Sequence, residues 1–159
     1  FRSITGGHAL NLTSLALTNT GGLIRAEGSL TISTQGQSLV NTDSGTAGGI
    51  VSLSALTITT GGLNNQAGFI ASDGTASLTA GAVSNQNGLL AGNGGLTISS
   101  QALDNTQGTL QSSADLSAIT HGLTFTNVHG TVSGGGNTRV ISGALDNTSG
   151  NIQGGTALT

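Results

Sequence analysis

Apolar and polar positions recur along this chain in a fixed pattern, and an asparagine marks each copy of it. Successive copies begin 22, 24, 20, 20, 22 and 20 residues apart. An apolar residue lies two positions before every asparagine, and a glycine lies three positions after all of them except one, where Ser44 takes its place. The recurring residues are Asn19, Asn41, Asn65, Asn85, Asn105, Asn127 and Asn147. Self-similarity at such a period predicts a solenoid with one coil per repeat.

Within each copy the apolar residues of a cluster lie two positions apart, as Leu30 and Ile32 or Leu96 and Ile98 do. Alternation with period two is typical of strands, and no stretch shows helical spacing. Glycine and asparagine separate the clusters, and both tolerate the backbone angles that sharp corners need. We therefore expect an all-β fold: a parallel β-helix of about seven coils, each with three short strands, that forms a single segment over residues 1–159.

The seven asparagines occupy equivalent places in successive coils. Parallel pairing would stack them at a spacing of about 4.8 Å. At that spacing each side-chain amide can bond to the next coil, as amide ladders do in stacked β-structures. We expect an internal asparagine ladder.

Surplus residues interrupt the repeat at three places: around Gln35 to Ser38, at Asp43 to Gly49, and near His121 and Gly122. Solenoids accept insertions where loops leave the coil, often on a binding face. The longest insertion makes Asp43, Ser44, Gly45 and Thr46 a candidate binding loop. The alternative is neutral variation at a corner, which the sequence favours.

Composition narrows the class of protein. Charged residues make up 6% of the chain, which contains 28 glycines and no cysteine, proline, tryptophan or tyrosine. Spaced aliphatic residues argue against disorder, the usual reading of such polar composition. A net charge of −3 with three scattered arginines argues against nucleic-acid binding, and no apolar run is long enough for a membrane span. The absence of cysteine would suit a protein that crosses a membrane unfolded.

Candidate catalytic groups are sparse. Asp104 and Asp146 share one repeat position, and Glu27 and Asp73 share another. Each pair would lie two coils apart, about 9.6 Å, a separation compatible with an inverting glycosidase. No basic or tyrosine neighbour completes a cleft, so we interpret these acids as solvated charges. The histidines form no metal-binding pattern; they are His8, His121 and His129. We expect no cofactor, no metal and no enzymatic activity.

The pattern L-x-N-x-x-G-x-I-x-A-x-G-x-L-x-I, which runs from Leu17 to Ile32, recurs in part from Val83 to Ile98. It resembles the haemagglutinin repeats of filamentous haemagglutinin and of contact-dependent growth inhibition toxins. The resemblance covers the chain from about Leu10 to Thr159 and is weakest in the second copy. It implies a right-handed β-helix that forms a stalk segment of a two-partner-secretion exoprotein from a Gram-negative bacterium.

The resemblance also implies partners: an outer-membrane secretion barrel, and a host-cell or neighbouring-bacterium receptor or glycan bound by the parent protein. It implies a secreted protein or one at the bacterial cell surface, associated with the outer membrane. Because the chain opens at Phe1 and stops within a repeat, we expect a piece of a longer filament. Two alternatives remain: a polysaccharide-degrading β-helix enzyme and a self-assembling amyloid-type fibre subunit.

Overall fold

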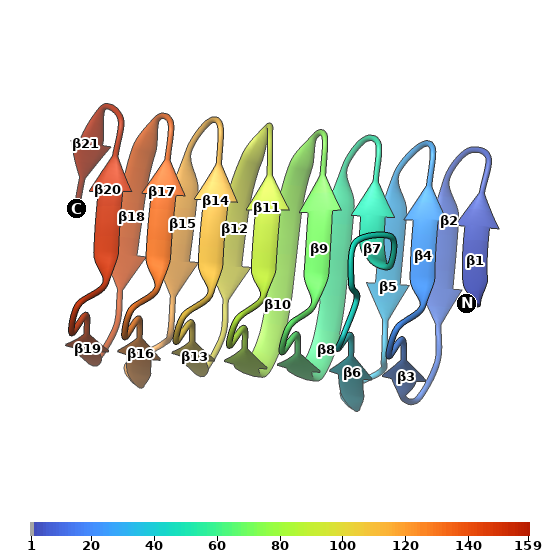
Figure 1. Cartoon of the computed structure of the whole chain (residues 1–159), viewed down its shortest axis with the longest axis horizontal. Coiled ribbons are helices and arrows are strands. Elements are labelled where there is room, and N and C mark those ends of the chain that lie inside the picture. Colours follow the sequence, from blue (N-terminus) through green and yellow to red (C-terminus); the bar gives the residue numbers. More distant parts are fainter. Residues whose placement is uncertain (1) are drawn as a thin grey trace.

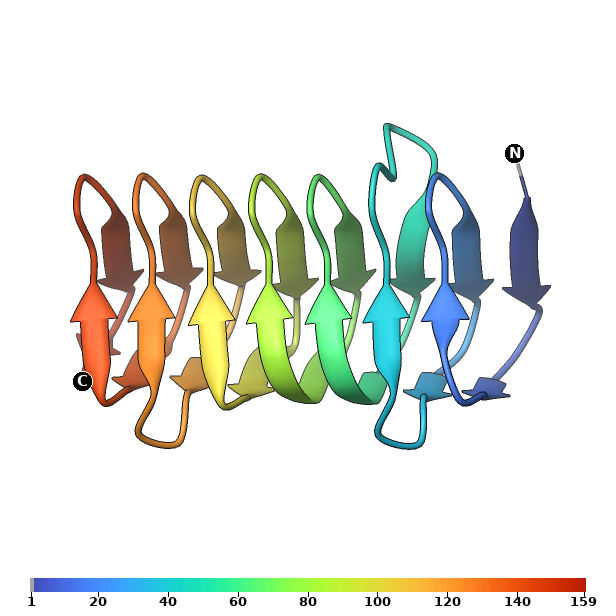
Figure 2. The same ribbon diagram turned by 90° about the horizontal axis from the view of Figure 1, so that it is seen from below.

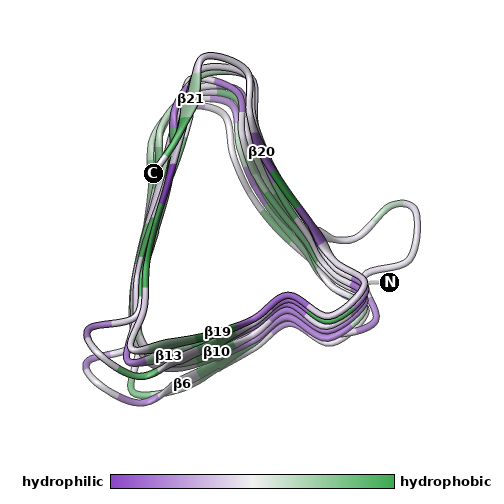
Figure 3. Ribbon diagram, turned by 90° about the vertical axis from the view of Figure 1, so that its left-hand side faces the viewer, coloured by the Kyte–Doolittle hydropathy of each residue, from purple (hydrophilic) through white to green (hydrophobic). Residues whose placement is uncertain are grey.

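The computed structural model describes residues 2–159, which form one β-solenoid with a triangular cross-section (Figure 1, Figure 3). Seen from its C-terminal end, the chain winds counterclockwise as it comes toward the viewer, which is the right-handed sense. Neighbouring strands pair in parallel, one turn above the next. The predicted all-β parallel helix is therefore confirmed. Within residues 2–159 we find no helix with the length and apolar character needed to cross a membrane.

The first face of the triangle is an eight-stranded sheet with one strand from each turn. Alternate residues of each strand point toward the axis. An aliphatic residue such as Ile24 or Ile70 is followed two positions later by a small one, such as Ala26 or Ser72. The strands of this face are β1 (Ser3–Gly6), β4 (Leu23–Ala26), β7 (Gly49–Ser52), β9 (Phe69–Ser72), β11 (Leu89–Gly92), β14 (Thr109–Ser112), β17 (Thr131–Gly134) and β20 (Asn151–Gly154).

A thirteen-stranded sheet forms the other two faces. The second face contains β2 (Leu10–Thr13), β5 (Leu30–Ser33), β8 (Leu56–Asn64), β10 (Thr75–Ser84), β12 (Gly95–Ser99), β15 (Leu116–Ile119), β18 (Asn137–Ile141) and β21 (Ala157–Leu158). The third face contains β3 (Leu17–Thr18), β6 (Ser38–Val40), β13 (Ala102–Asp104), β16 (Thr124–Thr126) and β19 (Ala144–Asp146), together with the second halves of β8 and β10.

Two turns depart from the expected three separate strands. In β8 and β10 the strand continues around the corner between the second and third faces, and their pairing includes Thr60 with Ala80 at the bend. The strands that precede Asn19 also belong to the solenoid, because β1 pairs with β4 and β2 pairs with β5. The first face thus has eight strands although the chain has seven marker asparagines.

The core is a stack of aliphatic files along the solenoid axis. Ile24, Ile50 and Ile70 lie above one another on the first face and are at most 3% exposed. Phe125, which is fully buried, provides the only aromatic ring in this core among the described residues. Burial of one such side chain contributes about 1.5–3 kcal/mol, so many thin layers can sustain the fold. Leu145 remains 48% exposed because few residues follow it to cover the last turn.

All three stretches of surplus residues lie at corners, where they leave the strands undisturbed (Figure 2). The two shorter ones project at the corner between the second and third faces. There Thr34 donates its hydroxyl to Gln37 O at 2.5 Å, and Thr120 donates to Leu123 O at 2.8 Å. The corner hydroxyl thus closes each loop, and this accounts for a threonine at its start.

A file of small residues, polar except for Ala80, follows this same corner from turn to turn. Thr60 donates to Gln37 O at 2.8 Å and accepts from Thr34 Oγ1 at 2.8 Å. Ser100 lies in this file with its hydroxyl buried and without a hydrogen-bond partner among the described residues. A buried hydroxyl without a partner destabilises the fold, since it has lost its bonds to water.

Replacing Ser100 with alanine should therefore raise the melting temperature. Ala80 already holds the equivalent position one turn earlier, so a methyl group fits there. We expect a gain of about 1 kcal/mol, or roughly 3 °C, measured by thermal denaturation followed by circular dichroism. Thr60→Ala is the control and should lower the melting temperature, because the Thr60 hydroxyl lies within hydrogen-bonding distance of Thr34 Oγ1, Gln37 O and Gly62 O. Loss of stability in Ser100→Ala would contradict this assignment.

Candidate functional site

The corner between the third and first faces carries the marker asparagines in one continuous file. Each side-chain amide from Asn19 to Asn127 donates to the Oδ1 of the asparagine in the next turn, at 2.7 to 2.8 Å. All of them from Asn41 to Asn127 are fully buried, whereas Asn147 at the last copy is half-buried. The file has a direction, because every amide donates toward the C-terminal end.

Each amide also donates to backbone carbonyls at its corner. Asn105 Nδ2 donates to Gly108 O at 3.1 Å and to Thr131 O at 3.2 Å in the next turn, in addition to Asn127. Its backbone N–H donates to Thr126 O at 2.7 Å. The asparagine therefore ties its own corner to the one above it, which is a structural role and not a chemical one.

A tight turn follows each asparagine, and its shape explains the glycine three positions later. Gly108 N donates back to Asn105 O at 3.0 Å, and the residue before the glycine, Gln107, has φ of +56°. A Cβ on Gly108 would overlap Asn85 O of the preceding turn. Residues with side chains tolerate the left-handed position at the same place in other turns, as His129 does with φ of +53°.

The candidate binding loop begins where the second turn departs from this pattern. Ser44 is only 5% exposed; its Oγ accepts from Phe69 N at 3.0 Å, and its carbonyl accepts from Gly48 N at 2.9 Å. Asp43, Gly45 and Thr46 are exposed. The structure thus divides the four predicted residues: Ser44 anchors the loop to the next turn, and the other three face solvent.

The loop forms one wall of an open hollow of about 500 Å³ on the outer surface of the first face. Its floor is apolar, formed by Leu23 and Val51 with the ring of Phe69, and Arg25 lies at one side. Gly49 occupies the place between Leu23 and Phe69, where its φ of +110° and the nearby Phe69 backbone exclude a side chain. We name this hollow the loop pocket. Leu23, Arg25 and Phe69 were not singled out from the sequence, although each lies at an outward position of its strand.

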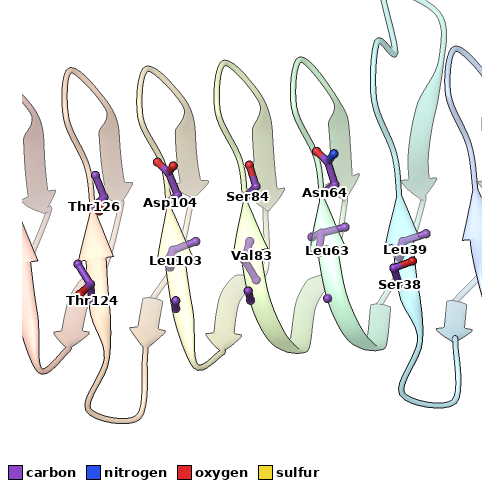
Figure 4. A pocket seen from close by; sticks show the side chains of 13 residues that line it. Ser38, Leu39, Leu63, Asn64, Val83, Ser84, Leu103, Asp104, Thr124 and Thr126 are labelled. Carbon is purple, nitrogen blue, oxygen red and sulfur yellow. The ribbon is translucent and has the colours of Figure 1, made fainter.

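A second hollow, of about 460 Å³, runs across the outer surface of the third face (Figure 4). Small residues such as Gly62, Ala82 and Ala102 leave it open, and a polar file follows one edge. That file contains Asn64, Ser84, Asp104 and Thr126. The hollow is shallow and mostly apolar, and its one charged group is Asp104.

The acids considered as catalytic, Asp104 and Asp146, accept hydrogen bonds from the residues of the turns that follow them. Asp104 pairs with Thr126, which pairs with Asp146, so the two acids lie two turns apart as expected. Burial raises the pKa of Asp104, but hydrogen bonds from Thr106 and Gln86 outweigh it and lower the pKa. Hydrogen bonds from the Thr148 hydroxyl and amide lower the pKa of Asp146. A glycosidase needs one acid with a raised pKa, and neither residue meets that need.

The remaining candidates are dispersed. Glu27 Oε1 lies 3.5 Å from Arg25 Nη1, and Asp73 accepts from Asn93 at 3.5 Å. His121 Nε2 lies 2.7 Å from Ser99 Oγ. Within residues 2–159 no group of three or more histidines and acids could hold a metal ion.

Comparison with known proteins gives one match. The model of a family described as "Haemagglutinin repeat" fits residues 2–37, 26–87, 71–122 and 117–159, which overlap and reach through all the turns of the solenoid. No curated protein and no solved structure matches the chain. The matched segments follow the same repeat that the buried asparagines mark.

Proposed function

Since this chain belongs to the haemagglutinin-repeat family, we propose that it is a stalk segment of a secreted, surface-located filamentous adhesin or contact-dependent inhibition exoprotein. The family is one of structural adhesins, and a stalk must hold other parts of its protein at a distance. In this proposal the segment is not an enzyme; its work is mechanical, and its corner loops contribute binding surface.

The asparagine file is the observation that carries the proposal. Six consecutive side-chain bonds link seven turns without a break. Each turn contacts its two neighbours only, so length can grow by adding turns while stiffness is kept. At about 4.8 Å per turn, the first-face strands extend over roughly 34 Å.

Secretion through an outer-membrane partner barrel is part of the proposal. The chain has no cysteine, so no disulfide could block its passage as an unfolded thread. Turns that stack one on another can also fold in sequence as the chain emerges, because each new turn finds its neighbour already formed. The receptor or glycan would be bound outside the cell by the parent protein.

The stalk role predicts that length increases by whole turns. We would replace Thr5 and Gln153 with cysteines that carry spin labels, since both are exposed in the same outward file of the first face. The absence of native cysteine makes this labelling specific. Electron paramagnetic resonance should give one narrow distance near 34 Å. A second copy of residues 86–105 inserted after Asn105 should lengthen it by about 4.8 Å.

A matched control inserts only residues 86–95, half of that repeat. This insertion should leave the distance unchanged, because half a repeat cannot complete a turn and would leave the stack as a loop at the corner, as the surplus residues of this chain do. A narrow, unchanged distance after the full-turn insertion, or a broad distribution in the unmodified chain, would contradict the proposal of a stiff stalk.

A further inference from the structure

We propose that the loop pocket binds an acidic sugar, the terminal residue of a glycan that carries a carboxylate. The inference deepens the proposed function, because it gives the binding surface of the stalk a place and a ligand class. It depends on the arrangement of an apolar floor, one guanidinium and a loop with free backbone amides.

The floor of the pocket suits the apolar face of a pyranose ring. Phe69 is half-buried on the outer surface, unlike the fully buried Phe125. Gly49, buried between Leu23 and the backbone of Phe69, adds no side chain to this floor. Small-ligand sites are usually lined by aromatic or aliphatic side chains that contact an apolar face of the ligand. A few polar groups then orient the ligand.

Arg25 supplies the positive charge. It pairs with Val51 across β4 and β7 and stands beside the floor. Its side chain is 39% exposed, and its one ion pair, to Glu27 Oε1 at 3.5 Å, engages only Nη1. A guanidinium has five N–H donors in a fork that matches a carboxylate, so donors remain for a ligand. The pocket is thus suited to an anionic group above an apolar ring.

The loop provides the third wall, and it is fixed in place at its base. Gly48 N bonds to Ser44 O, and Gly49 N bonds to Gly22 O at 2.7 Å. Thr46 and Ala47 at the tip are exposed. Their backbone amides face no strand, so they can donate to hydroxyl groups of a sugar.

The size of the pocket favours a sugar over larger partners. A hollow of about 500 Å³ is within the range for small ligands, and it holds one or two rings. A second copy of the chain would need about 800 Å² of contact on each side, more than this small patch provides. An added peptide strand needs an unpaired edge, whereas β4, β7 and β9 are each paired on both sides.

Binding of free sugars to the whole chain tests the inference. The probes are the methyl glycosides of N-acetylneuraminic acid and glucuronic acid, with methyl galactoside as the neutral comparison and a tetraglutamate peptide as the acidic one. Titration followed by nuclear magnetic resonance should show shifts at Leu23, Val51 and Phe69 with one or both acidic sugars. The neutral sugar should bind at least tenfold more weakly, because it has no partner for Arg25.

Two charge variants should change the affinity in opposite directions. Arg25→Gln should weaken binding of the acidic sugar about tenfold, which corresponds to about 1.4 kcal/mol. Glu27→Gln should strengthen it severalfold, because it removes the competing carboxylate from Arg25. Arg139→Gln, on β18 of the second face, is the matched control and should leave binding unchanged. Melting temperatures of all three variants show whether each remains folded.

Several outcomes would overturn the inference: no shifts at the floor residues, equal binding of neutral and acidic sugars, equal losses in Arg25→Gln and Arg139→Gln, or shifts produced by the peptide alone. The spin-label distances do not involve this pocket. Failure to bind sugar would therefore not contradict the stalk proposal. A flexible solenoid would refute the stalk proposal, but it would not change the result of the sugar titration.

Discussion

Replacing Gly108 with alanine should lower the melting temperature by about 12 °C, the equivalent of roughly 4 kcal/mol in a chain of this length. The added Cβ would overlap Asn85 O in the turn below and would lie 2.6 Å from Asn105 Oδ1. Neither atom can move freely, because Asn105 Oδ1 accepts from Asn85 Nδ2 at 2.7 Å. Relief of the overlap must separate two turns or break the asparagine file.

Gly62→Ala is the matched control for this substitution. The nearest atom to a Cβ at Gly62 is Ala82 O, at an ordinary contact distance of 3.7 Å. Alanine already stands at the paired positions of the next two turns, Ala82 and Ala102. We expect a change within about 0.5 kcal/mol. Equal losses in the two variants, measured by thermal denaturation, would show that any alanine in the solenoid is destabilising and would refute the specific contact.

Replacing Asn105 with leucine should be about as harmful, although the two side chains are similar in size. The change removes an acceptor from Asn85 Nδ2 and a donor from Asn127 Oδ1. It also removes the side-chain donor of Gly108 O and Thr131 O, although Gly108 O keeps the bond from Thr131 N. Buried polar groups without partners are destabilising by about 1–3 kcal/mol each. We therefore expect a loss of about 4 kcal/mol in the free energy of unfolding.

Two comparisons make this prediction specific. Thr97→Ala changes an exposed side chain and should alter stability by less than about 0.5 kcal/mol. Asn147→Leu should lose less than Asn105→Leu, because Asn147 is half-buried and, within the described residues, its side-chain amide donates only to Gly150 O. Chemical denaturation of the three variants gives the free energies. If Asn105→Leu and Thr97→Ala unfold alike, the asparagine file does not stabilise the solenoid.

The spacing of Asn85, Asn105 and Asn127 was enough to predict the fold, because a period of about one coil leaves few ways to bury the apolar residues. The inward positions followed from alternation within each strand. The first turn could not be counted in this way, since no marker asparagine precedes β1. The continuous strands β8 and β10 could not be predicted either, because hydrogen bonding around a corner depends on how the turns above and below are aligned.

At the candidate site, the difference between what the sequence predicts and what only the structure shows is larger. The sequence located the inserted loop, yet it gave no means to recognise that Ser44 would be buried and would accept from Phe69 N. Nor did it bring Leu23, Gly49 and Phe69 together. These residues lie side by side because the loop returns to the solenoid at Gly49 in register with Leu23. A shift of one residue at that point would have turned Val51 inward and closed the pocket.

By itself, then, the sequence determined the winding of the chain, its thin aliphatic core and the file of asparagines, because these features repeat and each copy confirms the next. Only the tertiary structure decided which residues meet at the loop pocket and how the acids are bonded. The physical reason is that a repeat specifies contacts between equivalent residues, whereas the insertion happens once. Where the chain re-enters the stack is fixed by pairing with the turns on either side, and that pairing exists only in three dimensions.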